Sequence, residues 1–516
     1  MRRATGGAVL GLLLALAGCK DVVWQARLLP PDSPALRAAD PAAPFLKAHG
    51  IDGSVTVLSA WSADPAARTL SGEGRRFDAD RRLVATGPVT LPFDELALVE
   101  TNRPEILERS ELRVLGVVAG ATVGVAALCA LSPKACFGSC PTFYAGAGGA
   151  GRVLAEGFSA SVARPLEDTD VDALDLPGPR GGTVQLTMRN EALETHLVRS
   201  LRLLAVARPG GGRVYRAGDR YLPAGREHAP LECRGAAGDC LAAVAADDDL
   251  EYRSPAGERD LAEPELVELA FPRPPGPLGL VVRARNSLLN TFVFYQGLAW
   301  LGTRAGDAFA RLEALAPGQA PAFDEWSRLL GRAEAEVRTG AGWVRAGAFG
   351  EVGPIARETQ LVPLPEGLPA GPVRVRLRLT RGNWKLDRLA LVELTGPEVT
   401  PVAILPAAVH RGGAPQAEAL SRLTGHGPRL VSLPGDAWTV DFPLPPALAE
   451  AELFLESRGY YLEWMREQWL KEEDPAAALA LLTRPREALR RLAPAYKAME
   501  AGAEAIFWSS RMGATP

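Results

Sequence analysis

Histidine and the short motifs of common active sites are scarce in this sequence. Five histidines occur in 516 residues, scattered without the spacing of metal ligands: His49, His196, His228, His410 and His426. The sequence also has no H-E-x-x-H, no G-x-S-x-G and no P-loop motif. These absences leave zinc proteases, serine hydrolases and nucleotide hydrolases without support, and no cofactor is expected. The catalytic carboxylates of an envelope glycan hydrolase form no short sequence motif of this kind, so a glycan-acting enzyme stays open as an alternative.

Neither sign of charge is in large excess. The chain has 57 Lys and Arg residues against 61 Asp and Glu residues, which gives a formal net charge of −4. Loss of Arg2 and Arg3 with a signal peptide would make the mature chain two units more negative. A balance of this size does not suggest nucleic acid as a partner.

The first twenty residues have the pattern of an export signal. Two arginines precede an apolar run over 8–17, as in a signal peptide. The residues that follow, Leu16-Ala17-Gly18-Cys19, resemble the lipobox of bacterial lipoproteins, which implies cleavage before Cys19 and lipidation of Cys19. Several lipid tails hold a protein stably on a membrane. By the same resemblance Lys20, which is not aspartate, favours the outer membrane of the cell envelope.

Five cysteines lie beyond Cys19, and two pairs of them are close in sequence. Cys233 and Cys240 enclose a short glycine-containing loop, and Cys136 and Cys140 lie four residues apart. In an exported chain such pairs are expected to be disulfides. A zinc site built from both pairs is the alternative, although neither has the usual C-x2-C spacing. Cys129 lies in apolar surroundings, which favour an inert buried thiol.

A long uncharged apolar stretch spans 114–131. Gly116, Gly120 and Gly124 recur every four residues, so one face of a helix here would be bare backbone. In membranes this spacing lets helices pack closely, but the stretch is short for a span. We expect a helix buried through its glycine face, mainly against protein. A membrane-inserted or oligomerising helix is the alternative.

The remaining pattern predicts a mixed, mainly β fold with two or more β-sandwich-like domains. Short alternating runs bounded by Gly, Pro and Asp indicate strands, and Asp474-Pro475 has the pattern of a helix start. The expected parts are a signal peptide over 1–18, a tether over 19–49, an N-terminal β-rich domain over 50–277 that includes 114–131, a helical connector over 278–340, a C-terminal β-sandwich-like domain over 341–458 and a helical tail over 459–516.

The strictest alternation runs from Val373 to Leu379. Its apolar residues alternate with Arg374, Arg376 and Arg378, so one face of the strand is apolar and the other is arginine. Three guanidinium groups in a row could bind lipid phosphates or acidic glycans. A strand with one solvated face is the ordinary explanation, and we favour it.

Several short motifs follow one another in the first half of the chain. They are an apolar segment followed by Ser139-Cys140-Pro141, Tyr144, Glu156-Gly157, Pro165-Leu166-Glu167, Thr169-Asp170 and Asn190-Glu191. These motifs resemble a family of uncharacterised bacterial lipoproteins and exported proteins, over roughly residues 90–210 and, more loosely, the C-terminal part. A glycine-rich loop after Tyr144 departs from the family pattern. The resemblance implies an architecture and no activity.

Together these patterns predict a membrane-anchored lipoprotein with a structural or binding role and an envelope protein as partner. A membrane-active assembly component that uses the glycine-spaced helix is the main alternative.

Overall fold

The computed structural model describes residues 20–37, 46–79, 82–108, 140–146, 152–176, 182–209, 212–248, 250–305, 308 and 325–512. These residues form two compact units. The first holds the described residues up to Glu108, except Arg82, together with Arg466–Gln468, and the second holds the rest. The predicted sites at Cys19, Cys129 and Cys136 and the glycine-spaced segment over 114–131 lie outside the described residues.

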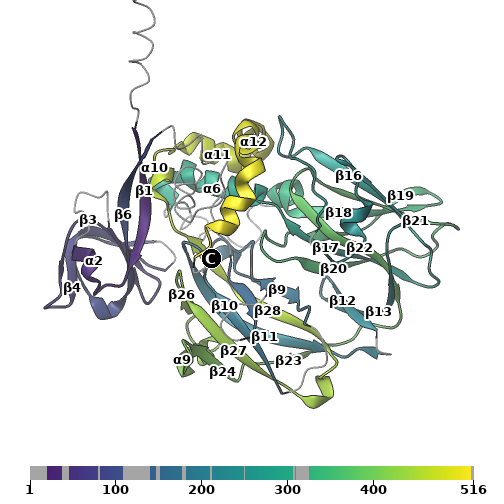
Figure 1. Ribbon diagram of the computed structural model, residues 1–516, viewed down its shortest axis with the longest axis horizontal. Helices are drawn as coiled ribbons and strands as arrows, with labels where there is room; N and C mark the ends of the chain where they lie inside the picture. Colours follow the sequence, from purple (N-terminus) through teal and green to yellow (C-terminus); the bar gives the residue numbers. More distant parts are fainter. Residues whose placement is uncertain are drawn as a thin grey trace, which may run out of the picture. The chain divides into compact units, whose positions relative to one another are not determined.

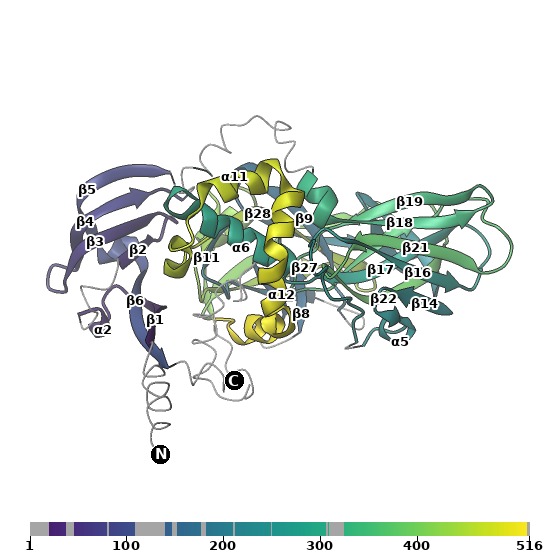
Figure 2. The ribbon, with the colours of Figure 1, turned by 90° about the horizontal axis from the view of Figure 1, so that it is seen from above.

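The first unit is a six-stranded antiparallel sheet with the strand order β1-β6-β2-β3-β4-β5 (Figure 2). Its core is a cluster of buried aliphatic and aromatic side chains that includes Leu46, Leu58, Leu70 and Val99. The elements are β1 (Lys20–Leu29), α2 (Pro34–Arg37), β2 (Leu46–Gly50), β3 (Val55–Asp64), β4 (Thr69–Phe77), β5 (Leu83–Pro92) and β6 (Leu96–Glu108).

The expected tether over 19–49 is wrong in its first part. Strand β1 begins at Lys20 and pairs with β6 along its whole length, from Lys20 opposite Glu108 to Leu29 opposite Val99. The Pro and Asp residues that suggested a tether lie after this strand, from Pro30 onward. Strand β1 therefore begins at the residue that directly follows the position expected to carry the lipid.

In the second unit, two sheets face each other around one apolar core and form the first sandwich. One sheet has the order β25-β24-β27-β10-β7-β8 and the other β23-β11-β28-β9. The elements are β7 (Thr142–Ala145), β8 (Val153–Glu156), β9 (Asp168–Ala173), β10 (Gly182–Arg189), β11 (Glu194–Val206), β23 (Val402–Ile404), β24 (Ala408–Arg411), β25 (Ala414–Pro415), α9 (Ala417–Leu423), β26 (Leu430–Ser432), β27 (Ala437–Leu444) and β28 (Glu452–Glu463).

The second sandwich is built from the chain between these two groups of strands. Its sheets have the orders β12-β13-β22-β17-β20 and β15-β14-β16-β21-β18-β19, with a separate apolar core between them. The elements are β12 (Arg213–Ala217), β13 (Arg220–His228), β14 (Glu232–Gly235), β15 (Gly238–Asp239), α5 (Leu241–Val244), β16 (Pro264–Phe271), β17 (Leu278–Asn286), β18 (Arg332–Thr339), β19 (Gly342–Gly350), β20 (Glu358–Pro363), β21 (Val373–Thr380) and β22 (Trp384–Leu394).

The second sandwich is thus inserted into the first. Strand β10 pairs with β27, and β11 pairs with β28, across more than 200 residues of sequence. Figure 1 shows the consequence, because blue strands near residue 200 lie beside yellow-green strands near residue 450. The mainly β fold with several sandwich-like sheets is confirmed. The predicted borders at 277 and 341 are wrong, since both fall inside the second sandwich.

Helices pack together beside the sandwiches and bury their own apolar cluster, which includes Leu289, Phe292, Leu481 and Tyr496. The elements are α6 (Leu289–Leu301), α10 (Glu467–Leu470), α11 (Pro475–Thr483) and α12 (Pro485–Ser509). Asp474 begins α11 as predicted, because its carboxylate accepts a hydrogen bond from the backbone N–H of Ala477.

Two predicted helical regions are partly strand. The connector over 278–340 begins with β17 and ends with β18, and the tail over 459–516 begins inside β28, which continues to Glu463. Strands β18 and β28 are held by pairing with β21 and β11, which overrides a local helical pattern. Across the described ranges, the helices that are long enough to cross a bilayer are not apolar enough to do so.

Candidate functional site

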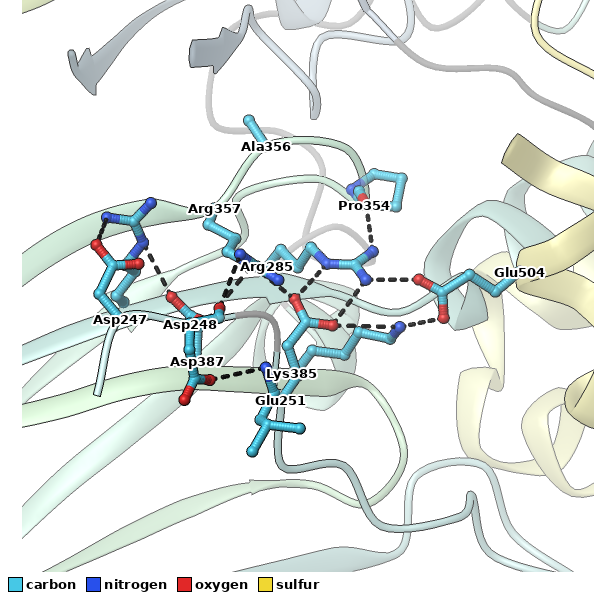
Figure 3. Close-up of polar contacts among 12 residues, drawn as sticks. Asp247, Asp248, Glu251, Arg285, Pro354, Ala356, Arg357, Lys385, Asp387 and Glu504 are labelled. Atoms are coloured by element: carbon cyan, nitrogen blue, oxygen red, sulfur yellow. Dashed lines mark hydrogen bonds and ion pairs between the residues drawn. The ribbon is translucent and has the colours of Figure 1, made fainter. Parts of the chain in front are cut away.

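An extended, largely buried polar cluster lies in the second sandwich, where helix α12 meets strands β17 and β22 (Figure 3). At its centre, Arg285 on β17 binds Glu251 with two hydrogen bonds. Nε donates to Oε1 and Nη2 to Oε2, each over 2.7 Å. This paired geometry is the strong, directional form of an arginine–carboxylate contact. Arg285 also donates from Nη1 to the carbonyl of Pro354 over 2.8 Å.

Helix α12 joins this cluster through Glu504. Its carboxylate accepts from Arg285 Nη2 over 2.5 Å and from Lys385 on β22. Lys385 Nζ also lies 3.5 Å from Glu251 Oε2, so the two cations and two carboxylates close a ring. Burial alone would raise the pKa of Glu504, but Arg285 and Lys385 outweigh it and lower the pKa to about 2. The Glu504 side chain is therefore ionised at neutral pH.

A second group of charges continues the cluster around Asp387, which is fully buried on β22. Arg283 Nε lies 3.0 Å from one carboxylate oxygen of Asp387, and Arg357 Nε lies 3.6 Å from the other. Arg357 Nε also donates to Glu251 over 2.9 Å and so links the two groups. Burial raises the pKa of Asp387 to about 6 against the effect of both guanidinium groups.

The space beside the cluster is small. A cavity of about 10 Å³ is bordered by Arg253, Arg285, Lys385, Glu500 and Glu504 among others, which is room for about one water molecule. Perturbed pKa values indicate active sites only where a reactant can also enter, and ion-pair networks perturb them as well. The arrangement fits a clamp that holds α12 against the sandwich.

The first unit contains a smaller buried cluster of three residues on β2 and β6. Lys47 Nζ donates to Glu100 Oε1 over 2.9 Å, and His49 Nε2 lies 3.2 Å from Glu100 Oε2. Burial would raise the pKa of Glu100, but Lys47 and His49 lower it to about 2. A glutamate ionised so firmly is a poor proton donor or acceptor at neutral pH. The cluster is therefore suited to holding β2 and β6 together.

A hollow of about 230 Å³ opens on the same unit. Its floor includes Ala48, Leu91 and Leu96, and its rim carries Asp52 and Arg76, whose charged atoms are 3.8 Å apart and largely exposed to solvent. This volume suits a small molecule, yet the rim charges already face each other. The hollow defines no ligand by itself.

The structure brings together one predicted cysteine pair. Cys233 and Cys240 form a disulfide with Cα atoms 5.0 Å apart, so the expected bridge is confirmed and the alternative zinc site from both pairs is wrong. Cys140 is buried, and its Sγ donates to Glu156 Oε1 over 3.5 Å. The expected bridge from Cys140 to Cys136 stays a prediction, because Cys136 lies outside the described residues.

The predicted arginine face lies on β21, with its three arginines pointing away from the core. Glutamates of the same sheet face them, one on the adjacent strand β18 and one on β14, the second strand away. Arg376 pairs with Glu336, Arg378 lies 3.9 Å from Glu336, and Arg374 lies 3.8 Å from Glu232. Arg376 also lies over the ring of Trp343. These cross-strand pairs support the solvated face that we favoured over an anion-binding site.

Asp168, Asp170 and Asp172 alternate along strand β9, so they do not lie in a calcium-binding loop. Among the described residues, no group of three or more His, Cys, Asp or Glu side chains is arranged so that it could hold a metal ion.

Sequence reasoning missed both charged clusters. Glu504 and Arg285 are 219 residues apart, and Glu100 and Lys47 are 53 apart. The one available signal was a charged residue within a strand rich in leucine and valine, such as Asp387 in β22.

Comparison with known proteins gives no family. Nothing among family models or curated proteins matches the chain. Two solved structures show weak similarity. A GH31 alpha-xylosidase from Xanthomonas citri is 8% identical over 84% of this chain and 38% of its own, with a TM-score of 0.13. The secreted serine protease VesC from Vibrio cholerae is 10% identical over 68% and 63%, with a TM-score of 0.12. The chain spans less than two thirds of either protein, and scores this low carry no argument.

Proposed function

We propose that this chain is a lipid-anchored protein of the cell envelope, held on the outer membrane, with a structural or binding role. The observation that carries the proposal is Leu16-Ala17-Gly18-Cys19 after an apolar run. The Cys233–Cys240 disulfide supports export, because disulfides persist in oxidising compartments.

The start of β1 adds a spatial argument. Strand β1 begins at Lys20, one residue after the expected lipid-bearing cysteine. A lipid on Cys19 would then hold the first unit at the membrane surface without an intervening tether. This placement supports a role at that surface, and an envelope protein is the proposed partner.

The buried clusters support a structural role for the second unit. The charges of Arg285, Lys385, Glu251 and Glu504 bind one another, and the adjoining cavity has room for about one water molecule. The alternative, an assembly component that uses Gly116, Gly120 and Gly124, rests on their spacing alone.

Mass spectrometry of the mature N-terminus tests the anchor. We expect an acylated Cys19 as the first residue and the protein in the membrane fraction. Cys19→Ser should leave the signal uncleaved or the protein unanchored. The control Cys129→Ser, outside the lipobox, should change neither property. An unacylated N-terminus in the unaltered chain would refute the proposal.

A further inference from the structure

Three carboxyl groups meet where the two sandwiches adjoin. Asp170 and Asp172 are alternate residues of β9, an edge strand of the first sandwich, and so share one of its faces. Glu358 begins β20, an edge strand of the second sandwich, which runs beside β9. Arg216 on β12 donates to the carbonyl of Val171 over 2.8 Å and to Glu358 Oε1 over 3.4 Å.

These acids are poorly compensated. The side chains of Asp172 and Glu358 are removed from water, with 4% and 7% of their residue surface exposed. Among the described residues, Asp172 Oδ2 has no hydrogen-bond partner, and neither has Ser457 Oγ on β28, the residue opposite Asp170. An ionised carboxylate in such a place is costly unless a cation or donors satisfy it.

Asp172 and Glu358 lie among charged groups from four strands. Asp168 and Asp170 lie on β9, Glu156 lies on β8, Glu358 lies on β20, and Arg216 lies on β12. Within the described part of the chain this is one guanidinium against several carboxyls. If all were ionised, the repulsion between them would act across the contact of the two sandwiches.

We propose that the contact between β9 and β20 is a proton-dependent junction. Asp172 and Glu358 retain at least one proton between them while the sandwiches are in contact, and loss of that proton loosens the junction. The inference does not depend on the lipid anchor. It makes the coupling of the two sandwiches respond to the pH around the protein.

The pKa values of Asp172 and Glu358 are both shifted upward, as a junction that holds a proton requires. Burial raises the pKa of Glu358 to about 8, with a further contribution from Asp170 and against the effects of Arg216 and of a hydrogen bond with the Gln360 side chain. Burial, followed by Asp170 and Glu358, raises the pKa of Asp172 well above its ordinary value. The folded state therefore holds a proton that the unfolded chain releases above an ordinary pKa of 4.5. This stabilisation is complete below that pH and is lost as pH rises toward 8.

Hydrogen exchange of the full mature chain, read by mass spectrometry, tests the junction. We measure peptides that cover 168–173 and 358–363 at pH 6, 7 and 8, corrected for the chemical exchange rate. One proton lost on opening makes the open population rise about tenfold per pH unit over this range. Glu358→Gln and Asp172→Asn, which mimic the protonated acids, should flatten this slope.

Glu366→Gln is the matched control, because Glu366 lies exposed after β20, and it should keep the slope of the unaltered chain. A flat slope in the unaltered chain overturns the proposal before any variant is made. Slopes in both variants equal to that of the unaltered chain overturn it as well. If one variant does not fold, the other and the unaltered chain decide.

Discussion

Two buried glutamates show how the same side chain takes opposite protonation states within this chain. Glu100 is held by Lys47 and His49, which lower its pKa to about 2. Glu358 has Arg216 at 3.4 Å and carboxyls nearby, and its pKa rises to about 8. Burial acts in the same direction on both. The number of nearby cations and their distance from the carboxylate decide whether the pKa is lowered or raised.

For Glu100 we predict a large cost on neutralisation. Glu100→Gln removes the negative charge beside the buried Lys47 ammonium, so unfolding of the first unit should become easier by about 3 kcal/mol. Because the folded pKa of Glu100 lies below its ordinary value, its contribution is present above pH 4.5 and is lost as pH falls toward 2. Denaturant unfolding at pH 7 and at pH 3 measures both effects.

The control is Glu73→Gln, an exposed residue of strand β4 in the same unit, which should change stability by less than about 0.5 kcal/mol. If Glu100→Gln is no more costly than this control at pH 7, Lys47 does not need the carboxylate.

At the scale of single residues, the sequence predicts contacts between residues that are close in sequence but not between residues that are far apart in sequence. Cys233 and Cys240 were predictable because seven residues separate them and an export signal precedes them. The ring of Arg285, Glu251, Lys385 and Glu504 was not predictable, because its members come from two strands, one loop and one helix. Which charged residue meets which is decided by the strand order.

At the scale of elements, α12 ties the two sandwiches together. Leu489, Leu492 and Tyr496 are spaced for one helical face and pack into the helical core. Glu504 binds Arg285 in the second sandwich. Just after the helix, the backbone N–H of Met512 donates to the carbonyl of Glu191 in the first sandwich over 2.9 Å. Helix α12 therefore links the two sandwiches.

Glu504→Gln should weaken the contact between helix α12 and the second sandwich. The substitution removes a charge from Arg285 and Lys385, and we expect a loss of about 1–2 kcal/mol, because about a third of the Glu504 side chain is exposed. Exchange should rise in peptides from 497 to 509 more than in β22.

Glu487→Gln on the same helix is the matched control, because its pair with Arg484 is exposed and should contribute under about 0.5 kcal/mol. Equal exchange in the two variants would show that Glu504 does not hold the helix.

The elements themselves were predictable in proportion to their periodicity. Alternation over 373–379 gives β21 with its valines and leucines inward. Residues 460–462 were expected to be helical and instead continue β28, where they pair with 195–197 of β11. A short apolar run fits either structure, and a partner strand more than 250 residues away decides it.

At the scale of the whole molecule, the insertion of one sandwich into the other explains why the expected borders failed. Composition changes mark loops, and the proline cluster before 278 is the loop between β16 and β17 of one sandwich. The true borders lie between 206 and 213 and between 394 and 402, where the chain leaves the first sandwich and returns to it. The first border contains Pro209 and three consecutive glycines, which mark it, whereas the second carries no composition signal stronger than the loops inside the insertion.

The two compact units have separate cores, which leads to the last prediction. The apolar cluster around Leu58 and Val99 belongs to the first unit, while the cores of both sandwiches and the helices belong to the second. Cooperative unfolding follows a shared core. We therefore expect two thermal transitions in calorimetry of the full mature chain at pH 7.

Glu100→Gln assigns these transitions. A loss of about 3 kcal/mol in a unit of this size should lower its midpoint by about 10 °C or more and leave the second transition in place. Glu504→Gln, in the second unit, should shift the other transition and spare the first. A single transition that moves with both variants would mean that the units unfold as one, and separate cores would then be the wrong basis for dividing the chain.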